Sequence, residues 1–272
     1  MVGMGKLPDG GEIINLLTRE RTLCRRTFET FTHPILFIRI IILKMDIVYV
    51  LQEWYYDCME LRISLRSLKN IPHGKVFIVW YKPDRVKNVI HIPCEDNDWR
   101  TPYANVEKKQ IVICNDERIS ADFIFMNDDH YILKPISEIK YYKRWTVLDH
   151  AKNVLERHWF DYYYRTILLI DKVFPWWDSY EVHTPIVFNK EKLLHIMDIY
   201  KDSIAQKRSL YCNHYKVQWE TLGEKLDCKL YDGEKLQVEE DQIFLSNDIY
   251  TAEKDSFRNF LYQLFPTPSE YE

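Results

Sequence analysis

Two adjacent aspartates, Asp128 and Asp129, follow the apolar run Phe123–Met126 and stand between Asn127 and His130. Neighbouring carboxylates raise each other's pKa, and burial at the end of a strand adds a desolvation penalty. A hard divalent cation bound through oxygen ligands removes both penalties. Asp128 and Asp129 are therefore candidate ligands of Mg²⁺ or Mn²⁺. The alternative is a polar strand end in which Asp128 caps a turn.

Two arginines, Arg62 and Arg66, are four residues apart and would share one face of a helix. Two neighbouring guanidinium groups form a forked clamp for phosphate or carboxylate. The alternative is a solvated helix face whose arginines form surface salt bridges. Arg208 is a candidate for a further phosphate contact, and its alternative is an ordinary loop arginine.

His183 and Trp80 complete the set of candidate site residues. A histidine in the segment Tyr180–Pro185 is a metal ligand, a general base or a hydrogen-bonded core residue. The ring of Trp80, or of its neighbour Tyr81, would offer a flat stacking surface to a ligand. The alternative for both rings is core packing.

From Met45 onward, short apolar runs alternate with amphipathic segments. Strands separated by helices favour an α/β fold, a three-layer α/β/α sandwich with a mostly parallel central sheet. The expected strands span residues 47–51, 76–80, 89–92, 119–126 and 181–188, and the expected helices span 58–68, 149–174, 190–200 and 256–265. Asp57 and Glu60 form a plausible capping box for the first helix. Ligands of such sheets bind beyond the carboxyl ends of the strands, where Trp80 and Asp128 would lie.

The composition bounds the function. With 272 residues, 46% of them hydrophobic, the chain can bury an ample core. A formal net charge of −4 gives no overall basic field for nucleic acid or membrane and leaves room only for a local basic groove. Six scattered cysteines without a CxxC pair fit a reducing, cytoplasmic location and suggest neither a zinc site nor a disulfide framework.

Residues 1–44 differ from the rest of the chain, because every tryptophan and tyrosine lies beyond them. Their apolar run, Pro34–Leu43, is too short to span a membrane and is interrupted by Arg39. It also lacks the order of a signal peptide. We therefore interpret residues 1–44 as a peripheral extension or an over-called start, with no membrane span.

Five segments, in the same order, resemble the Stealth family of sugar-phosphate transferases and, more broadly, GT-A-type glycosyltransferases. They are Met45–Tyr49, similar to the family's opening strand; Glu60–Ser67, similar to its ELRYSLRS segment; Val76–Val79, similar to its next strand; Phe123–Asp129, similar to its hydrophobic-NDD motif; and His183–Pro185, similar to its HTP motif. The chain departs from the family at Gln52–Trp54, which replaces a Trp-Val-Asp-like end, and at His130, where a hydrophobic residue is usual. The family's last conserved region is not recognisable. The glycine-poor, tyrosine- and lysine-rich style also resembles phage-encoded or bacterial glycosyltransferases.

The resemblance implies a GT-A-like catalytic domain over residues 45–272, with a nucleotide-sugar-binding half at 45–135 and an acceptor-side half at 136–272. It implies a nucleotide-sugar donor, Mg²⁺ or Mn²⁺, and a saccharide or other hydroxyl acceptor. The implied metal ligands are Asp128, Asp129 and His183. The implied catalytic residues are Asp129, His183 and Arg66, and the implied substrate-binding residues are Arg62, Arg66, Trp80, Asn127 and Arg208.

The leading interpretation is a metal-dependent glycosyltransferase, in which the donor's C1 is attacked and a nucleoside diphosphate leaves. In a Stealth-like sugar-1-phosphate transferase, the β-phosphorus is attacked and a nucleoside monophosphate leaves. The family match favours the second, whereas the missing family region and the short length favour the first. A phage DNA-base glycosyltransferase, acting in the host cytoplasm, gains no support from the acidic balance. A non-enzymatic carbohydrate-binding α/β domain is the remaining alternative.

Deleting residues 1–44 is expected to leave transferase activity intact, because the candidate site residues all lie beyond them. The activities of the full-length and truncated proteins would be compared at equal folded concentration. A truncated protein that folds but has lost activity would contradict the interpretation of this segment as peripheral.

Overall fold

The computed structural model describes residues 44–51, 58–96, 102–147, 149–150, 177–200, 206–221, 229–231 and 233–272. The predicted extension, apart from Lys44, and the predicted helix after Asp149 lie outside the described residues, as does Gln52–Trp54. Among the described residues, no helix combines the length and apolar character needed to cross a bilayer.

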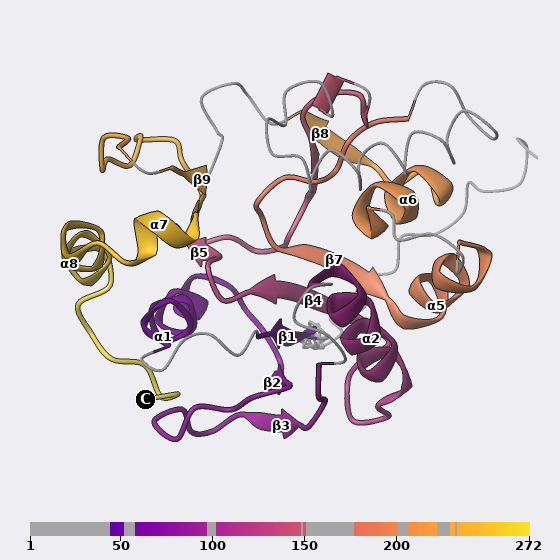
Figure 1. Ribbon diagram of the computed structural model, residues 1–272, viewed down its shortest axis with the longest axis horizontal. Helices are drawn as coiled ribbons and strands as arrows, with labels where there is room; N and C mark the ends of the chain where they lie inside the picture. The colour runs from indigo at the N-terminus through magenta and orange to yellow at the C-terminus, as the bar shows by residue number, and fades with distance from the viewer. Residues whose placement is uncertain are drawn as a thin grey trace, which may run out of the picture. The chain divides into compact units, whose positions relative to one another are not determined.

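The central sheet has the strand order β3-β2-β1-β4-β7 (Figure 1). Its strands are β1 (Asp46–Val50), β2 (Val76–Val79), β3 (Ile90–Ile92), β4 (Asp122–Asn127) and β7 (Ile186–Asn189). The first four are parallel to one another, and β7 pairs with β4 in the antiparallel sense. The predicted α/β class with a mainly parallel central sheet is therefore confirmed.

Alternate residues of β1 enter different cores, as the two-residue period of a strand requires. Val48 and Val50 pack into the core on one face of the sheet, and Ile47 and Tyr49 pack into the core on the other. Because both faces are covered, every residue of β1 is buried. This explains why the strand is read in the sequence as an almost continuous apolar run.

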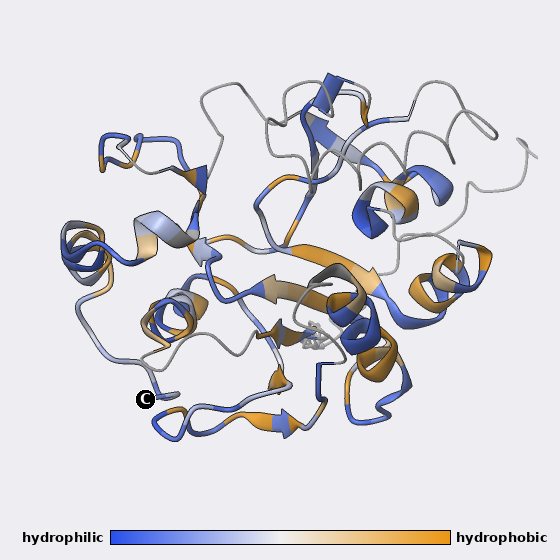
Figure 2. Ribbon diagram, in the orientation of Figure 1, coloured by the Kyte–Doolittle hydropathy of each residue, from blue (hydrophilic) through white to orange (hydrophobic). Residues whose placement is uncertain are grey.

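Helices cover both faces of this sheet and give three layers. The helix α1 (Met59–Ser67) packs its leucines into the core that holds Tyr49. The helices α2 (Pro102–Asn115) and α5 (Lys190–Ile199) pack into the core on the opposite face. Figure 2 shows apolar residues concentrated along the central strands and on parts of these helices. The Asn189 side chain caps α5 by accepting from the Lys192 amide at 3.2 Å.

Smaller elements complete the described structure. They are η1 (Leu68–Asn70), β5 (Tyr131–Ile132), β6 (Tyr141–Lys143), α6 (Lys207–His214), β8 (Trp219–Thr221), β9 (Lys229–Leu230), β10 (Phe244–Asn247), α7 (Ile249–Ala252) and α8 (Asp255–Leu264). The strands β5, β10 and β9 form one small sheet, and β6 pairs with β8. No sequence pattern indicated α6 or β8, because both lie in a stretch that is mostly polar.

The start of α1 differs from the predicted capping box. Cys58 is the N-cap residue, in a left-handed conformation with φ of 44° and without a side-chain capping bond. Glu60, the expected partner in the box, instead accepts a hydrogen bond from Asn247 of β10. The Glu60 carboxylate, which the local pattern predicted to bind the helix end, therefore binds a residue far along the chain.

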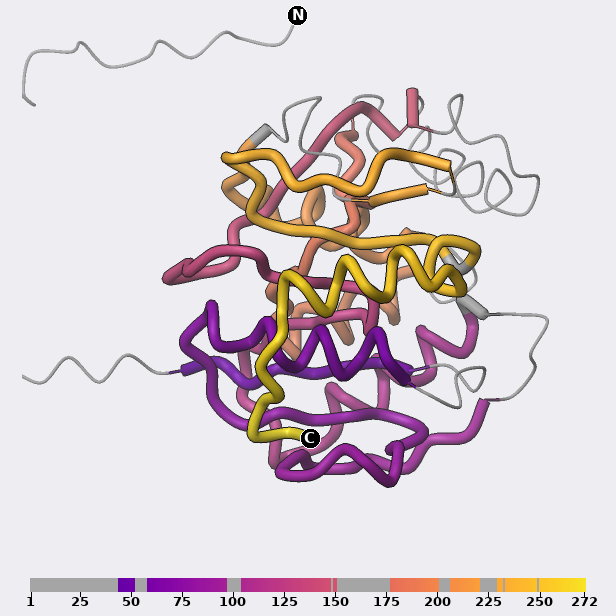
Figure 3. Tube along the Cα trace, turned by 90° about the vertical axis from the view of Figure 1, so that its left-hand side faces the viewer, coloured from indigo at the N-terminus to yellow at the C-terminus, as the bar shows by residue number. Residues whose placement is uncertain are grey.

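The C-terminal segment runs beside α1 and is anchored to it (Figures 1 and 3). Arg66 donates from Nε and Nη2 to the Glu272 carboxylate at 2.6 and 2.9 Å, and Arg62 Nε donates to the same group at 2.9 Å. Arg66 also donates to the Phe265 carbonyl at 2.7 Å. The side chains of Arg66 and Glu272 are both buried, so this ion pair is shielded from solvent.

Glu272→Gln is expected to lower the free energy of unfolding by about 3 kcal/mol, because it leaves the buried Arg66 guanidinium without a counter-charge. Urea denaturation at neutral pH measures the change. The matched control is Glu220→Gln, which removes an exposed ion pair with Lys140 and should have little effect. Equal stability of Glu272→Gln and the unchanged protein would show that the anchor contributes nothing.

Candidate functional site

The aspartates Asp128 and Asp129 lie where the topology predicts a ligand crevice. From β1, the sheet continues through β2 and β3 on one side and through β4 on the other. Ligands of open α/β sheets bind outside the carboxyl ends of the strands where the order reverses, here between β1 and β4. Asn127 ends β4, and the two aspartates follow it directly.

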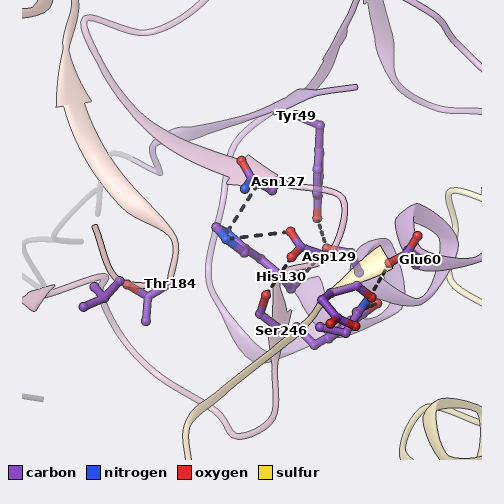
Figure 4. Close-up of polar contacts among 12 residues, drawn as sticks. Tyr49, Glu60, Asn127, Asp129, His130, Thr184 and Ser246 are labelled. Atoms are coloured by element: carbon purple, nitrogen blue, oxygen red, sulfur yellow. Dashed lines mark hydrogen bonds and ion pairs between the residues drawn. The ribbon is translucent and has the colours of Figure 1, made fainter. Parts of the chain in front are cut away.

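Asp129 is held by two neighbours. The Ser246 hydroxyl of β10 donates to Asp129 Oδ2 at 2.6 Å, and His130 Nε2 lies 3.9 Å from Asp129 Oδ1. Figure 4 shows His130 joined to both Asn127 and Asp129. The bond from Ser246 fixes the carboxylate at the carboxyl edge of the sheet, and the His130 ring lies beside it.

His130 is a buried, neutral histidine. Burial, together with the charges of Arg208 and Lys229, holds its pKa well below the usual value. Its Nδ1 accepts from the Asn127 amide at 3.3 Å, so the ring proton of the neutral form is on Nε2. That nitrogen faces Asp129 and has no hydrogen-bond partner within the described residues. The neutral His130 ring therefore lies beside Asp129 without a hydrogen bond to it.

Glu60 is a site residue that was not predicted. Its buried carboxylate accepts from Asn247 Nδ2 at 2.6 Å, and Asn247 Oδ1 accepts from the Tyr131 hydroxyl at 2.9 Å. Burial raises the pKa of Glu60 to about 7, the bond from Asn247 opposes the rise, and the charge of Asp129 adds to it. A carboxyl group with a pKa near neutrality in a ligand crevice is a functional candidate.

Glu60, Asp128 and Asp129 together form what we call the carboxylate cluster. Burial raises the pKa of Asp128 well above its ordinary value, and the negative charges of Glu60 and Asp129 raise it further. The negative charges of the cluster are thus not balanced at Asp128 by neighbouring positive side chains of the described residues. Protonation or a bound cation relieves this repulsion.

His183 lies on the segment that leads into β7. Arg208 Nη1 from α6 donates to the carbonyls of Val182 and Thr184 at 2.9 and 2.7 Å, which fixes the loop on both sides of His183. In Figure 4, Thr184 and Glu60 lie on opposite sides of Asp129. The sequence predicted a phosphate contact for Arg208, and the structure shows it holding the His183 loop.

The imidazole of His183 is neutral at neutral pH. Burial and the positive charge of Lys229 hold its pKa well below the usual value, although the charge of Asp129 acts in the opposite direction. A neutral imidazole accepts a proton or donates a lone pair to a metal. His183 is therefore a candidate base, coupled electrostatically to Asp129.

The predicted ligands Asp128, Asp129 and His183 do not come together as a complete metal site. In the part of the chain that the structure describes, no group of three or more His, Cys, Asp or Glu side chains is arranged to hold a metal ion. Magnesium commonly takes one or two carboxylates and completes its coordination with water and substrate phosphates. The excess negative charge of Asp128 and Asp129 fits this mode.

Trp80 ends β2 in a strained conformation. Its φ is 96°, which is unfavourable for a bulky residue. Two hydrogen bonds hold this conformation. The Trp80 amide donates to the Ile92 carbonyl at 2.9 Å, and His91 Nε2 donates to the Trp80 carbonyl at 2.8 Å. Such outliers cluster at ligand sites. The predicted position of Trp80 at the carboxyl edge is confirmed.

Lys109 is a second site residue that was not predicted. Its fully buried side chain reaches from α2 to the Leu51 carbonyl and to Asp96 Oδ1, both at 2.7 Å. Its Nζ also lies 5.0 Å from the centre of the Trp80 ring. Leu51 follows β1, so a buried cation stands at the carboxyl edge of the strands that flank the aspartates.

Arg62 and Arg66 are not brought to the aspartates by α1. Residues two apart on a helix are separated by about 200°, so the arginines lie on the face opposite Glu60 and Ser64. Ser64 donates to the His130 carbonyl at 2.5 Å, whereas both arginines bind Glu272. In the segment Glu60–Ser67, the helix face that meets the site therefore carries Glu60 and not the arginines.

No protein-family model and no curated protein matches the sequence. Among solved structures, the chain is similar to the galactosyltransferase LgtC in complex with donor and acceptor sugar analogs, with 10% identity, 83% of this chain and 98% of that chain covered, and a TM-score of 0.44. An active-site mutant of LgtC gives the same coverage and identity and a TM-score of 0.45. The apo-form glycosyltransferase GlyE of Streptococcus pneumoniae gives 10% identity, 67% and 46% coverage, and a TM-score of 0.29. All three scores are low, so function is inferred from the site residues.

Glu60→Gln is expected to remove a pH dependence of stability. The Glu60 carboxyl has a pKa of about 7 in the folded protein, against an ordinary value of 4.5. The stability that its protonated form contributes is complete below pH 4.5 and is lost as the pH rises through 7. Relative to the variant, the unchanged protein should therefore lose up to about 3 kcal/mol between about pH 5 and pH 8.

Urea denaturation in the presence of a chelator measures this difference, since a bound cation would mask it. The carboxamide oxygen of the substituted side chain can still accept from Asn247, so the variant removes the charge and keeps the hydrogen bond. Parallel pH profiles for the two proteins would contradict the raised pKa.

Proposed function

We propose that this protein is a metal-dependent transferase that uses a nucleotide-sugar donor and a hydroxyl acceptor. The observation that carries the proposal is the carboxylate cluster at the point where the strand order reverses. The negative charges that raise the pKa of Asp128 would be neutralised by a cation, which the two aspartates would hold together with the oxygens of a diphosphate. The order of the ELR, NDD and HTP segments in the sequence supports the same assignment.

Asp128 and Asp129 would hold Mg²⁺ or Mn²⁺ together with the donor's phosphate oxygens. When bound, the cation would neutralise the negative charge on the leaving phosphate. The Ser246 hydroxyl donates to Asp129, and the charge of Asp129 helps to raise the pKa of the buried Glu60 carboxyl.

His183 would accept the proton of the acceptor hydroxyl. Its imidazole is neutral, and Arg208 holds the loop that carries it. A base in this position makes the hydroxyl oxygen a better nucleophile as it attacks the donor.

The nucleoside part of the donor would lie over Trp80, beside Lys109 and Asp96. An aromatic ring offers a stacking surface for a base, and Asp96 offers an acceptor for ribose or base donors. Lys109 already neutralises Asp96 in part, so the buried pair is stable before a ligand arrives. The acceptor is a saccharide or another hydroxyl compound; the net charge of −4 does not favour DNA.

Two reaction types are compatible with this donor. In glycosyl transfer, the acceptor oxygen bonds to C1, the bond from C1 to the phosphate oxygen breaks, and a nucleoside diphosphate leaves. In sugar-1-phosphate transfer, the acceptor oxygen bonds to the β-phosphorus, the α–β bridge breaks, and a nucleoside monophosphate leaves. The closeness of Glu60–Ser67 and Phe123–Asp129 to the Stealth motifs is the observation that favours the second type.

Asp129→Asn is expected to lower the turnover number by about 100-fold or more, because charge stabilisation at the leaving group is a dominant catalytic contribution. The assay combines a panel of nucleotide sugars with Mn²⁺ and identifies the nucleotide released. Nucleoside diphosphate identifies glycosyl transfer, and nucleoside monophosphate identifies sugar-phosphate transfer.

The matched control is Asp122→Asn, an identical change at the other end of β4, where Asp122 accepts from Asn189 at 2.9 Å. The control should keep nearly full activity. Full activity in Asp129→Asn, or turnover that persists after chelation of divalent metal, would contradict the proposed function.

A further inference from the structure

A pocket of about 460 Å³ opens at the amino-terminal edge of the central sheet. It is lined by residues that precede three parallel strands: Lys44 before β1, Lys75 before β2 and Asn88 before β3. The carboxylate cluster follows β4 at the opposite edge. A strand of five residues spans about 16 Å, so this amino-edge pocket is separate from the proposed donor site.

The amino-edge pocket is basic in a chain that is acidic overall. Lys44, Lys69 and Lys75 line it, and Glu270 is the one carboxylate among its lining residues. None of the three lysines has an acidic partner among the residues that the structure describes. Three uncompensated ammonium groups around one concave surface attract an anion.

The walls of the pocket are fixed by the backbone. The Gly74 amide donates to the Met45 carbonyl at 2.8 Å, and the Lys75 amide donates to Asp46 Oδ1 at 2.7 Å. A Cβ on Gly74 would collide with Asp46 Oδ1 and would lie 2.9 Å from the Lys44 carbonyl, so this close approach requires glycine. The lysine stems therefore start from a rigid frame.

The C-terminal segment closes one side of the pocket. The Lys87 amide donates to the Tyr271 carbonyl at 3.0 Å, and the buried Tyr271 ring packs into the core beneath α1. Figures 1 and 3 show this segment descending beside α1 to its end near the loop before β3. The Lys69 ammonium lies 5.8 Å from the centre of the Phe265 ring, which orients it at the rim.

The floor gives the pocket a mixed character. Leu68, Ile71 and Val76 are buried apolar residues in its lining, and the partly buried Ile90 stands beside them. Sites for small molecules have volumes of about 300 to 1,000 Å³ and combine apolar walls with a few polar groups. The lining is mainly polar, and the partly buried Ile90 with the small exposed parts of Leu68, Ile71 and Val76 offers apolar contact to the organic part of a phosphate ester.

We propose that the amino-edge pocket binds a phosphate-bearing ligand, whose phosphate is held by Lys44, Lys69 and Lys75 and whose organic part lies over the apolar floor. Two sources carry this chemistry, a free phosphorylated small molecule and the headgroup of an anionic lipid. The proposal does not depend on the proposed function, since the two sites share no residues. It adds a second binding site to the chain.

The test uses the full chain in the presence of a chelator, so that a metal-linked phosphate site at the aspartates is silent. One arm titrates inorganic phosphate and glycerol 3-phosphate by calorimetry. The other arm measures cosedimentation with vesicles of phosphatidylcholine that contain phosphatidylglycerol, against vesicles of phosphatidylcholine alone. The test variant is Lys69→Gln with Lys75→Gln, two exposed positions where the change should not disturb folding.

Binding in either arm should weaken by about tenfold or more in the double variant and should fall as the salt concentration rises. The matched control, Lys235→Gln in the exposed loop before β10, should bind as the unchanged protein does. Binding of glycerol 3-phosphate identifies a soluble ligand, and binding only to anionic vesicles identifies a lipid headgroup. Absence of binding in both arms, or equal binding by the double variant, would overturn the proposal.

Discussion

Repulsion among Glu60, Asp128 and Asp129 is the constraint on which the site depends. Three carboxyl groups from α1 and from the end of β4 meet where burial alone already raises the pKa of Glu60 and Asp128. The fold brings them together although the charges of Glu60 and Asp129 oppose the ionisation of Asp128, and the charge of Asp129 opposes that of Glu60. Such an arrangement is stable with a proton or a cation, and a diphosphate donor provides the remaining oxygens for a cation.

The sheet and α1 impose this arrangement on the carboxyl groups. Asp128 and Asp129 are placed by β4, whose partner β1 is buried on both faces. Glu60 is placed by α1, which is fixed on its opposite face by the ion pairs of Arg62 and Arg66 with Glu272. The arginines therefore act on the site through the orientation of the helix, while Ser64 and Glu60 face the residues that follow β4.

Local patterns in the sequence predicted the five strands of the central sheet, α5, α8 and the position of the two aspartates, because a strand and the residues that follow it are adjacent in the chain. They did not predict the role of Glu60, whose partner Asn247 is 187 residues away. The partner of Arg66 is 206 residues away, so the clamp predicted from its spacing became an anchor for the C-terminal segment. Lys109 carried no signal at all, since its burial depends on three strand ends that meet only in the folded protein.

The central claim is that the aspartates bind a cation together with a diphosphate. Calorimetric titration of Mn²⁺ in the presence and absence of a panel of nucleoside diphosphates tests it most directly. We predict that at least one nucleoside diphosphate binds much more tightly with Mn²⁺ than in a chelator, and that Asp129→Asn removes this difference. Equal nucleotide binding with and without Mn²⁺, or a metal effect that persists in Asp129→Asn, would contradict the account.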